Sequence, residues 1–301
     1  MSIAKYIKEI GRGKQGARAL SREHAADLFG QVLDGAVTDL EIGGFCLAMR
    51  IKGETAQEMA GFLDATDTRL QKIPAADRPV MVIPSYNGAR KLPALAPLLA
   101  LLLAREGLPV LLHGVASEST RVFTSGVLEA LDIAPQIAIG PARAGQVMFV
   151  PTALLCPGLQ RLLDVRRAVG LRNPAHSLVK IMNPCAGKSL VISSYTHPEY
   201  ALSMAATFEL VRANAMLLRG TEGESVADPR RMPQMDGFLN GQRVLLQEAQ
   251  SGALSVLPEL PREMDAASTA GYIRKVMAGN CPTPAPIAQQ VKHLLNLVSQ
   301  L

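Results

Sequence analysis

Basic side chains gathered in two short segments are the groups in this sequence best suited to binding phosphate. Residues 1–22 hold six basic side chains and one acid, Glu9, and residues 158–188 hold six more and one acid, Asp164. Each segment has a net charge of +5, although the whole 301-residue chain also carries only +5. If the fold brings the two segments together, they form a surface that neutralises phosphates. The alternative interpretation is two solvated helix faces.

The rest of the composition argues against several other kinds of site. Aromatic residues make up 4% of the chain and Trp is absent, so stacked aromatic platforms for bases are not expected. The four Cys contain no Cys-x-x-Cys pair and are predicted to be core thiols, with neither a disulfide framework nor a metal site. The longest apolar run, residues 92–104, is shorter than the roughly 20 residues of a membrane span. We therefore expect a cytoplasmic protein with no membrane partner.

The elements that must position the basic residues change character along the chain. Capping-box patterns at residues 38–41 and 55–58 predict helix starts in a helical first quarter. Short apolar strands then alternate with helices, beginning with a strand at 80–83, a helix at 93–106 and a strand at 110–112. This order predicts an α/β protein with a small all-helical N-terminal domain and a larger α/β domain that has a central, mainly parallel sheet.

Ordered motifs over most of the chain resemble the anthranilate phosphoribosyltransferase and pyrimidine nucleoside phosphorylase superfamily. Residues 20–55 resemble its N-terminal helical domain. Further matching motifs are His113-Gly114, Gly126 to Leu131, Val165-Arg166-Arg167, Gly170-Leu171-Arg172 and Asn183-Pro184.

The resemblance also implies how the chain divides into domains. It places residues 1–72 in the helical domain, joined by about 158–188, and residues 73–157 and 189–301 in the α/β domain. Both basic segments then belong to the helical domain, and their charges are expected to add within one region.

The sequence departs from that superfamily where the transferase chemistry takes place. A Gly-Thr-Gly-Gly-Asp turn there cradles pyrophosphate on backbone amides, which requires glycine. Residues 85–91 here read Ser-Tyr-Asn-Gly-Ala-Arg-Lys, with Ala89 in place of the Asp. The acidic Leu-Asp-Glu element that helps to hold magnesium is replaced by Gly-Thr-Glu-Gly-Glu-Ser at 220–225. Loss of these carboxylates removes charge compensation for a leaving pyrophosphate, so phosphoribosyl transfer, a bound metal and a cofactor are not expected.

The altered motifs resemble the YbiB-type branch of the superfamily. The runs that carry this second resemblance are residues 85–91, 113–114, 119–121, 172–176, 197–200 and 220–224. The branch is similar to the transferases in fold and dimeric arrangement, and its association with sequence-independent nucleic-acid binding implies the same activity here. Arg90 and Lys91 would then make a fixed cationic surface that attracts phosphate without metal.

Several single residues allow two interpretations at this point. His113 is either a satisfied histidine at a strand end or a phosphate donor, and His197 before a proline is either a helix-start residue or a phosphate donor. Arg166 either pairs with Asp164 or contacts phosphate. Tyr86 is the one aromatic residue in a plausible binding turn, and stacking on a sugar or base is one of its two interpretations, beside a role without ligand contact.

The sequence as a whole predicts a non-enzymatic, DNA-binding homodimer that takes single-stranded or duplex DNA, with RNA as a further candidate, in a basic groove. The residues expected to contact nucleic acid are Lys5, Lys8, Arg12, Lys14, Arg90, Lys91, Arg121, Arg166, Arg167, Arg172 and Lys180. A remnant phosphate pocket is expected at Ser85, Asn87, Gly88, His113 and Ser117. The alternative is a glycosyl or phosphoribosyl transferase that acts on a phosphorylated or ribosylated small molecule in this pocket, with Arg166.

Overall fold

The chain forms two compact units, each built from two separate stretches of sequence. The computed structural model describes residues 2–115, 120–254 and 257–301. The first unit comprises residues 1–71 and 152–184, and the second comprises residues 72–151 and 185–301. The chain therefore passes between units after residues 71, 151 and 184, where the sequence predicted breaks after 72, 157 and 188.

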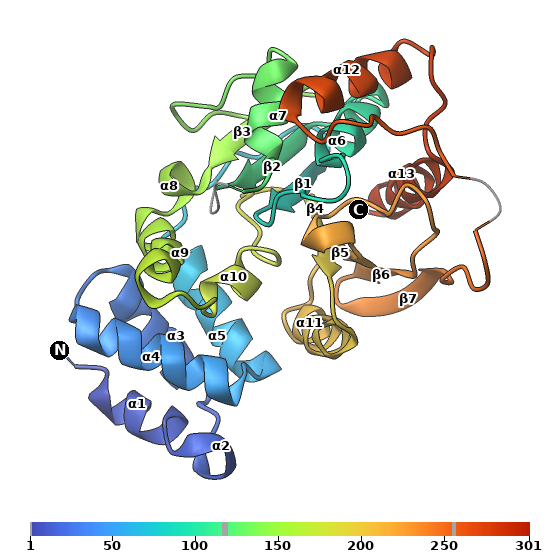
Figure 1. The fold of residues 1–301 in the computed structure, drawn as a ribbon. Helices are drawn as coiled ribbons and strands as arrows, with labels where there is room; N and C mark the ends of the chain where they lie inside the picture. The colour runs from blue at the N-terminus through green and yellow to red at the C-terminus, as the bar shows by residue number, and fades with distance from the viewer. Residues whose placement is uncertain (1, 116–119, 255–256) are drawn as a thin grey trace. The chain divides into compact units, whose positions relative to one another are not determined.

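The regular secondary structure in the described residues of the first unit is entirely helical (Figure 1). Both predicted capping boxes form, with Thr38 and Glu41 at the start of one helix and Thr55 and Glu58 at the start of the next. Its helices are α1 (Ala4–Ile10), α2 (Gly13–Gly16), α3 (Arg22–Leu33), α4 (Asp39–Lys52), α5 (Ala56–Asp67), α8 (Thr152–Leu155), α9 (Pro157–Val169) and α10 (Ala175–Leu178).

Three buried phenylalanines form the centre of this unit. The rings of Phe29 on α3 and Phe62 on α5 are stacked with centroids 4.6 Å apart, and Phe45 on α4 meets both rings edge-on. Helices α3 and α5 approach closely at Gly61, where an added Cβ would lie 2.2 Å from the Arg22 carbonyl oxygen. Helix α9 packs on this pair through α3.

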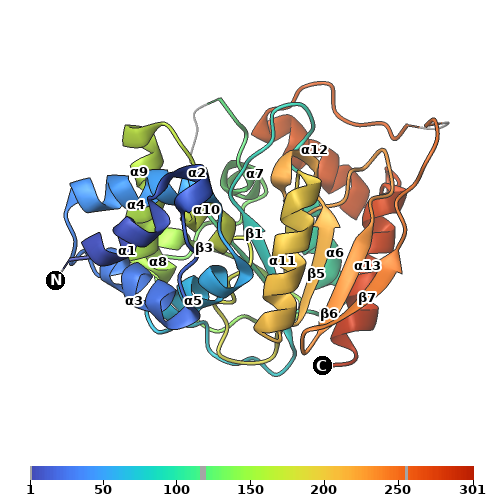
Figure 2. The ribbon, with the colours of Figure 1, turned by 90° about the horizontal axis from the view of Figure 1, so that it is seen from below.

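The second unit contains a seven-stranded sheet in the order β3-β2-β1-β4-β5-β6-β7 (Figures 1 and 2). The strands from β3 to β5 are parallel, and β6 and β7 are antiparallel, so the prediction of a mainly parallel sheet is confirmed. The strands are β1 (Val80–Ser85), β2 (Val110–Gly114), β3 (Val147–Pro151), β4 (Ser189–Tyr195), β5 (Ala215–Arg219), β6 (Met235–Leu239) and β7 (Gln242–Gln247). The helices are α6 (Ala96–Arg105), α7 (Thr124–Ala130), α11 (Pro198–Leu210), α12 (Ala266–Met277), α13 (Ala285–Val298) and the short 3-10 turn η1 (Thr221–Gly223).

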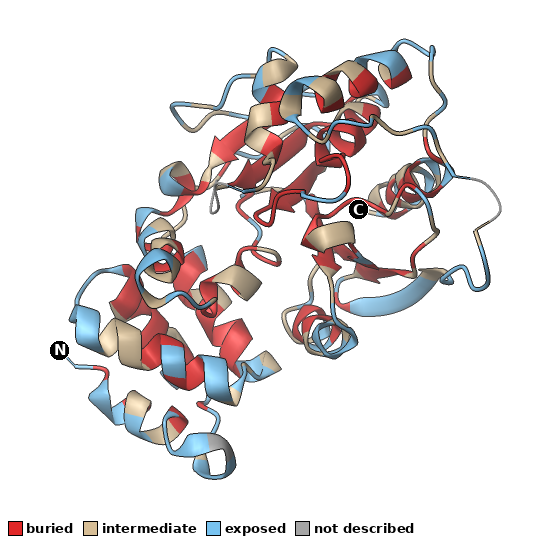
Figure 3. Cartoon of the chain, viewed as in Figure 1, coloured by how far each residue is buried: buried red, intermediate tan, exposed pale blue. Residues whose placement is uncertain are grey.

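The parallel strands are buried on both faces, whereas β7 is an exposed edge strand (Figure 3). The predicted helix at 93–106 begins only at Ala96, with Pro97 in its first turn, where a missing N–H costs nothing. Parallel strands end at one edge of a sheet, and ligands of open α/β sheets bind there. Strands β1, β4 and β5 are parallel, so the segments that follow β1 and β5 leave the sheet at this same edge. Only β4 lies between the two strands, so these segments are close together.

Over the part of the chain that the structure describes, no helix combines the length and the apolar character needed to cross a membrane. None of the four cysteines, all in the described part of the chain, is joined in a disulfide. Cys46, Cys156 and Cys185 are buried, and Cys281 is partly buried.

Candidate functional site

The turn after β1 has a backbone shape that only glycine adopts easily at its centre. Gly88 has φ +65°, and an added Cβ would lie 3.1 Å from atoms of Arg121, Val122 and Phe123. Ala89 forms a two-residue antiparallel bridge with Val122, and Arg121 donates to the Gly88 carbonyl oxygen at 3.2 Å. Arg121 and Val122, which precede α7, therefore fix the outer side of this turn by hydrogen bonds to its backbone.

The carboxylate of Glu224 fills the inside of this turn. One carboxylate oxygen accepts hydrogen bonds from the backbone N–H groups of Asn87 at 2.8 Å and Gly88 at 2.9 Å. The other accepts a short hydrogen bond from the hydroxyl of Ser85, which also hydrogen-bonds Thr124 at 2.7 Å. Glu224 is only 3% exposed, so these donors replace the water that a carboxylate normally requires.

A second carboxylate binds the other half of the turn. One oxygen of Glu222 accepts from the backbone N–H groups of Arg90, Lys91 and Leu92 at 2.9, 3.0 and 3.3 Å. Successive backbone N–H groups that converge in this way form an anion-binding concavity. Since the Ala89 N–H donates to the Val122 carbonyl, every backbone N–H from residue 87 to 92 already has an acceptor within the protein.

The segment that carries the two glutamates is fastened on several sides. Glu222 has φ +53°, a left-handed conformation that costs a non-glycine residue roughly 1 kcal/mol or more. Ser194 on β4 donates to the Gly223 carbonyl, and Ser225 donates to the Pro84 carbonyl on β1, both at 3.0 Å. The buried side chain of Gln290 on α13 donates to the Ser225 carbonyl at 3.0 Å. The glutamates are thus held in place by the sheet and by α13.

This arrangement does not fit the magnesium and pyrophosphate that the superfamily binds at the corresponding turn. The backbone N–H groups that would hold a phosphate carry the chain's own carboxylates. Both oxygens of Glu224 and one oxygen of Glu222 accept hydrogen bonds from N–H or O–H donors, which compete with a cation for the same lone pairs. The sequence motifs assigned Ser85, Asn87 and Gly88 to phosphate, and the structure places all three against Glu224.

The other residues of the expected remnant pocket have different surroundings. His113 on β2 is fully buried, and burial lowers its pKa to about 3, so the ring is neutral. Its Nδ1 hydrogen-bonds the Tyr86 hydroxyl at 2.7 Å, whereas its buried Nε2 has no hydrogen-bond partner within the described ranges. Ser117 lies outside the described residues. Arg166 belongs to the first unit and the remaining pocket residues belong to the second.

Three basic residues of the first unit lie near enough to His176 for their charges to lower its pKa. Helix α9 ends at Gly170, whose φ of +75° turns the chain back, and Asn173 locks this turn by donating to the Leu162 carbonyl at 2.7 Å. His176 follows on α10 and is partly buried. Its pKa is lowered to about 4, first by burial and then by the charges of Arg172, Arg166 and Lys180. We call these three basic residues the cationic cluster.

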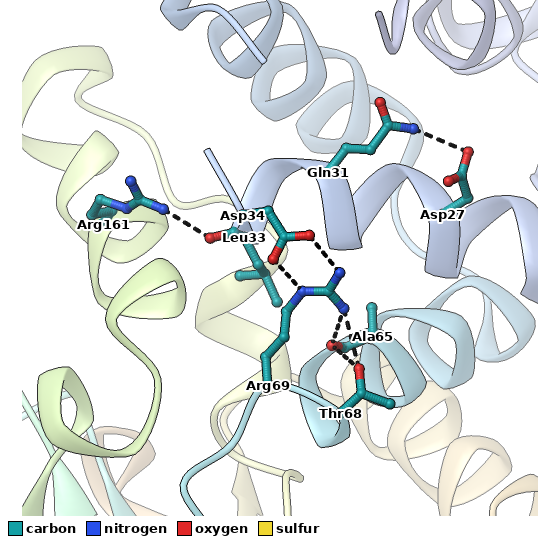
Figure 4. A network of polar contacts seen from close by, with 8 residues as sticks. All are labelled: Asp27, Gln31, Leu33, Asp34, Ala65, Thr68, Arg69 and Arg161. Atoms are coloured by element: carbon teal, nitrogen blue, oxygen red, sulfur yellow. Dashed lines mark hydrogen bonds and ion pairs between the residues drawn. The ribbon is translucent and has the colours of Figure 1, made fainter. Parts of the chain in front are cut away.

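Not every basic residue of the second basic segment is available to a ligand. Arg161 on α9 donates to the carbonyl oxygen of Leu33 at the end of α3 at 2.8 Å (Figure 4). Beside it Arg69 forms a two-bond ion pair with Asp34, and Arg69 and Arg161 both lower the pKa of that carboxyl. Arg161 therefore ties α9 to α3 and has a structural role.

The remaining predicted contact residues are mostly exposed. Lys5 and Lys8 lie on the exposed side of α1, and Lys14 lies in α2. Arg12 is exposed but pairs with Glu9 at 2.6 Å. Exposed side chains are also found at Arg167, which lies 3.4 Å from Asp164, and at Arg90 and Lys91.

The two basic segments are not neighbours within the first unit. Helix α1 packs on α4, whereas α9 packs on α3 and α8, and Figure 1 shows α1 and α9 on opposite sides of the α3 and α4 layer. The expectation that both +5 charges add in one region of a single chain is therefore wrong. The helices of the bundle core, α3 and α4, stand between the two segments.

Comparison with known proteins identifies relatives for the whole chain. Residues 4–68 match the helical bundle domain of a glycosyl transferase family. The chain is 42% identical to the uncharacterized protein YbiB of Escherichia coli (strain K12), over 97% of this chain and 92% of that protein. It is 26% identical to an anthranilate phosphoribosyltransferase of Methanopyrus kandleri, over 94% of this chain and 85% of the relative.

Solved structures share the same fold. Anthranilate phosphoribosyltransferase of Thermus thermophilus superposes with a TM-score of 0.70 at 20% identity, covering 95% of this chain and 85% of that one. The Saccharomyces cerevisiae enzyme in complex with PRPP and Mg superposes with a TM-score of 0.69 at 13% identity, covering 99% and 89%. The prediction of a transferase-like fold with a helical N-terminal domain is confirmed.

Proposed function

Because this chain belongs to the YbiB family within the anthranilate phosphoribosyltransferase-like superfamily, we propose that it is a homodimeric, sequence-independent nucleic-acid-binding protein that uses the transferase fold as a scaffold and does not transfer phosphoribosyl groups. The observation that supports the binding proposal is that Arg166, Arg172 and Lys180 lie near enough to His176 for their positive charges to lower its pKa. Cations that converge on one place bind phosphate more tightly than the same charges spread over a surface.

The turn at residues 85–92 supports the proposal that the protein does not transfer phosphoribosyl groups. Transfer of a phosphoribosyl group requires donors that stabilise the leaving pyrophosphate as its charge develops. Glu222 and Glu224 occupy those donors in this chain, and the two carboxylates would also repel a pyrophosphate. The fold is therefore retained without the electrostatic preorganisation that the reaction needs.

Binding without sequence preference follows from the kinds of residue available. Lys and Arg contact phosphates, which position a protein on nucleic acid and carry no sequence information. Further exposed cations are Lys5 and Lys8 on α1 and Arg167 on α9 in the first unit, and Arg90 and Lys91 in the second unit. We therefore expect single-stranded and duplex DNA to bind through the backbone.

A fluorescence titration with single-stranded and duplex oligonucleotides across a salt series tests this proposal. If about six phosphates are neutralised, the slope of log K against log salt is roughly −4 to −5. Replacing Arg166 and Arg172 by Ala should reduce the magnitude of the slope by nearly one for each phosphate that is no longer neutralised. The double variant Lys5→Ala with Lys8→Ala tests the separate α1 surface in the same way.

Lys275→Ala with Lys292→Ala is the matched control, since both side chains are exposed on helices of the second unit, α12 and α13. Equal losses of affinity from all three pairs would mean diffuse attraction to a basic protein. A flat salt response, or a strong preference for one oligonucleotide sequence, would contradict the proposal. Magnesium-dependent release of pyrophosphate from phosphoribosyl pyrophosphate would favour the transferase alternative.

A further inference from the structure

The turn that ends α9 exposes a short apolar tip in the middle of the second basic segment. This apolar tip comprises residues 168–171, and its largest side chain, Leu171, is 43% exposed. Arg167 and Arg172 stand on either side of it in the sequence. Asp164, the one acid of the segment, already lies 3.4 Å from Arg167. The apolar tip is therefore bordered by positive charge.

Two anchors fix the backbone of the apolar tip. Gly170 has φ +75°, a left-handed conformation suited to glycine, and its N–H donates to the Arg166 carbonyl oxygen at 2.8 Å. On the other side, the buried Asn173 donates from its side chain to the Leu162 carbonyl oxygen at 2.7 Å. A ligand that contacts Leu171 does not have to order this turn, which lowers the entropic cost of binding.

Open space beside Leu171 suits a flat ligand. A Cβ added at Gly170 would have nothing within 4 Å among the described residues, so a ring can approach the backbone there closely. A nucleobase has two flat faces, which are accessible when the base is unstacked in a single strand. In a duplex the neighbouring base pairs cover these faces. The apolar tip therefore has the shape and the chemistry to contact a base of a single strand.

We propose that Leu171 packs against an unstacked base of single-stranded nucleic acid, while Arg167 and the cationic cluster bind the adjoining phosphates. This inference rests on the proposed function and deepens it, because it adds a base contact to a protein whose other proposed contacts are to the backbone. The contact tolerates any sequence, since every base has such a face. In a duplex, a leucine reaches the same face only by separating two stacked base pairs, which costs free energy. Single strands therefore gain a contact that duplexes lack.

A lipid surface fits the apolar tip less well than a base does. Leu171 is the one large exposed apolar side chain of the tip. Stable attachment to a membrane requires a broad apolar face or two anchoring signals. One side chain is enough to cover part of one base. Each base of a strand also lies between two phosphates, as Leu171 lies between basic residues.

A comparison of single-stranded oligothymidine with the same strand carrying abasic sites tests the base contact. Both probes have the same phosphates, so a difference in affinity at one salt concentration reports contact with bases. The wild-type protein should bind oligothymidine about fivefold more tightly, the effect expected from burying the exposed part of one leucine. Leu171→Ala should remove most of this difference. It should leave the affinity for the abasic strand and the salt slope unchanged, because no charge is lost.

Two variants serve as controls. Leu202→Ala shortens a 72% exposed leucine on α11 of the second unit and should leave both affinities unchanged. Arg167→Ala should weaken binding of both probes by the same factor and reduce the magnitude of the salt slope. The fluorescence of a 2-aminopurine within the strand rises when this base is unstacked, and it should rise more on binding to the wild-type protein than to Leu171→Ala. Melting curves show whether each variant is folded.

The outcomes separate this inference from the proposed function. Equal affinity of the wild-type protein for the two probes would overturn the base contact and leave the proposed function standing. An equal loss of affinity for both probes in a folded Leu171→Ala would also overturn it. If neither probe binds at any salt concentration, the proposed function fails and the base contact with it. Sedimentation with phosphatidylglycerol vesicles that Leu171→Ala abolishes would assign the apolar tip to a membrane instead.

Discussion

Removal of the Glu224 carboxylate tests whether the protein fills its own anion-binding turn. The carboxylate accepts two backbone N–H groups and the Ser85 hydroxyl in a site that is 3% exposed. Glu224→Ala leaves these donors buried without an acceptor, which should destabilise the protein by about 3–5 kcal/mol. Glu224→Gln keeps one acceptor oxygen for the N–H groups and should cost about 1–3 kcal/mol.

Thermal unfolding with and without inorganic pyrophosphate measures both consequences. For a unit of this size about 1 kcal/mol corresponds to roughly 2–4 °C, so the alanine variant should melt about 10 °C below wild type. In Glu224→Ala the freed N–H groups can bind an external anion, and pyrophosphate at about 100 times its Kd would restore about 2.7 kcal/mol. Pyrophosphate should not raise the melting temperature of the wild-type protein through this turn, because its own carboxylates occupy the same donors.

Glu263→Ala is the control for loss of one negative charge, since Glu263 is exposed in the second unit. If Glu224→Ala has the same melting temperature as this control, the hydrogen bonds to the Glu224 carboxylate contribute nothing to stability. That result would refute the reasoning. It is equally refuted if pyrophosphate stabilises the wild-type protein and Glu224→Ala to the same extent in the presence of the same salt.

Three further predictions concern single positions. Gly88→Ala should lower the midpoint of thermal unfolding clearly, because a side chain at φ +65° is strained and its Cβ would meet atoms at 3.1 Å; an unchanged midpoint would contradict this. The pKa of His176 is lowered to about 4 from an ordinary value near 6.5, so the unfolded state binds the extra proton between these pH values and the free energy of unfolding should fall as pH falls from 6.5 to 4. His176→Gln should make that pH dependence shallower in denaturant titrations, by up to about 1.4 kcal/mol per pH unit, and an unchanged slope would place the linkage elsewhere. Thr38→Ala removes one capping box and should cost about 1 kcal/mol in the same titrations, whereas a neutral result would show that α4 is held by packing alone.

Much of the secondary structure could be predicted because helix caps and short apolar strands are recognised from a few neighbouring residues. The capping boxes at residues 38–41 and 55–58 form as predicted, since each is completed within one helical turn. The hairpin of β6 and β7 was missed, although Asn240-Gly241 between them is a strong turn signal, and both residues have the positive φ of a tight hairpin. That signal was available in the sequence.

The candidate site was decided by contacts between residues far apart in the sequence. Glu224 accepts hydrogen bonds from the backbone N–H groups of Gly88 and Asn87, which are 136 and 137 residues away in the sequence. No local sequence pattern predicts that a carboxylate of the chain will bind these N–H groups in place of a phosphate. The absence of an adjacent Asp-Glu pair was evident from the sequence, but Glu222 and Glu224 were given no role. Arg166, Arg172 and Lys180, in contrast, lie close together in the sequence, and all three are among the residues that the sequence predicts to contact nucleic acid.

Charge, composition and the ordered motifs of the sequence by themselves determined the superfamily, the helical and α/β parts and the identity of the basic segments. Only the tertiary structure decided that α3 and α4 separate those segments, and that the turn at residues 85–92 is already occupied. The physical reason is that propensity, capping and net charge are properties of neighbouring residues. Where two distant segments meet depends instead on how the sheet and the helical bundle pack, which no single stretch of the chain encodes.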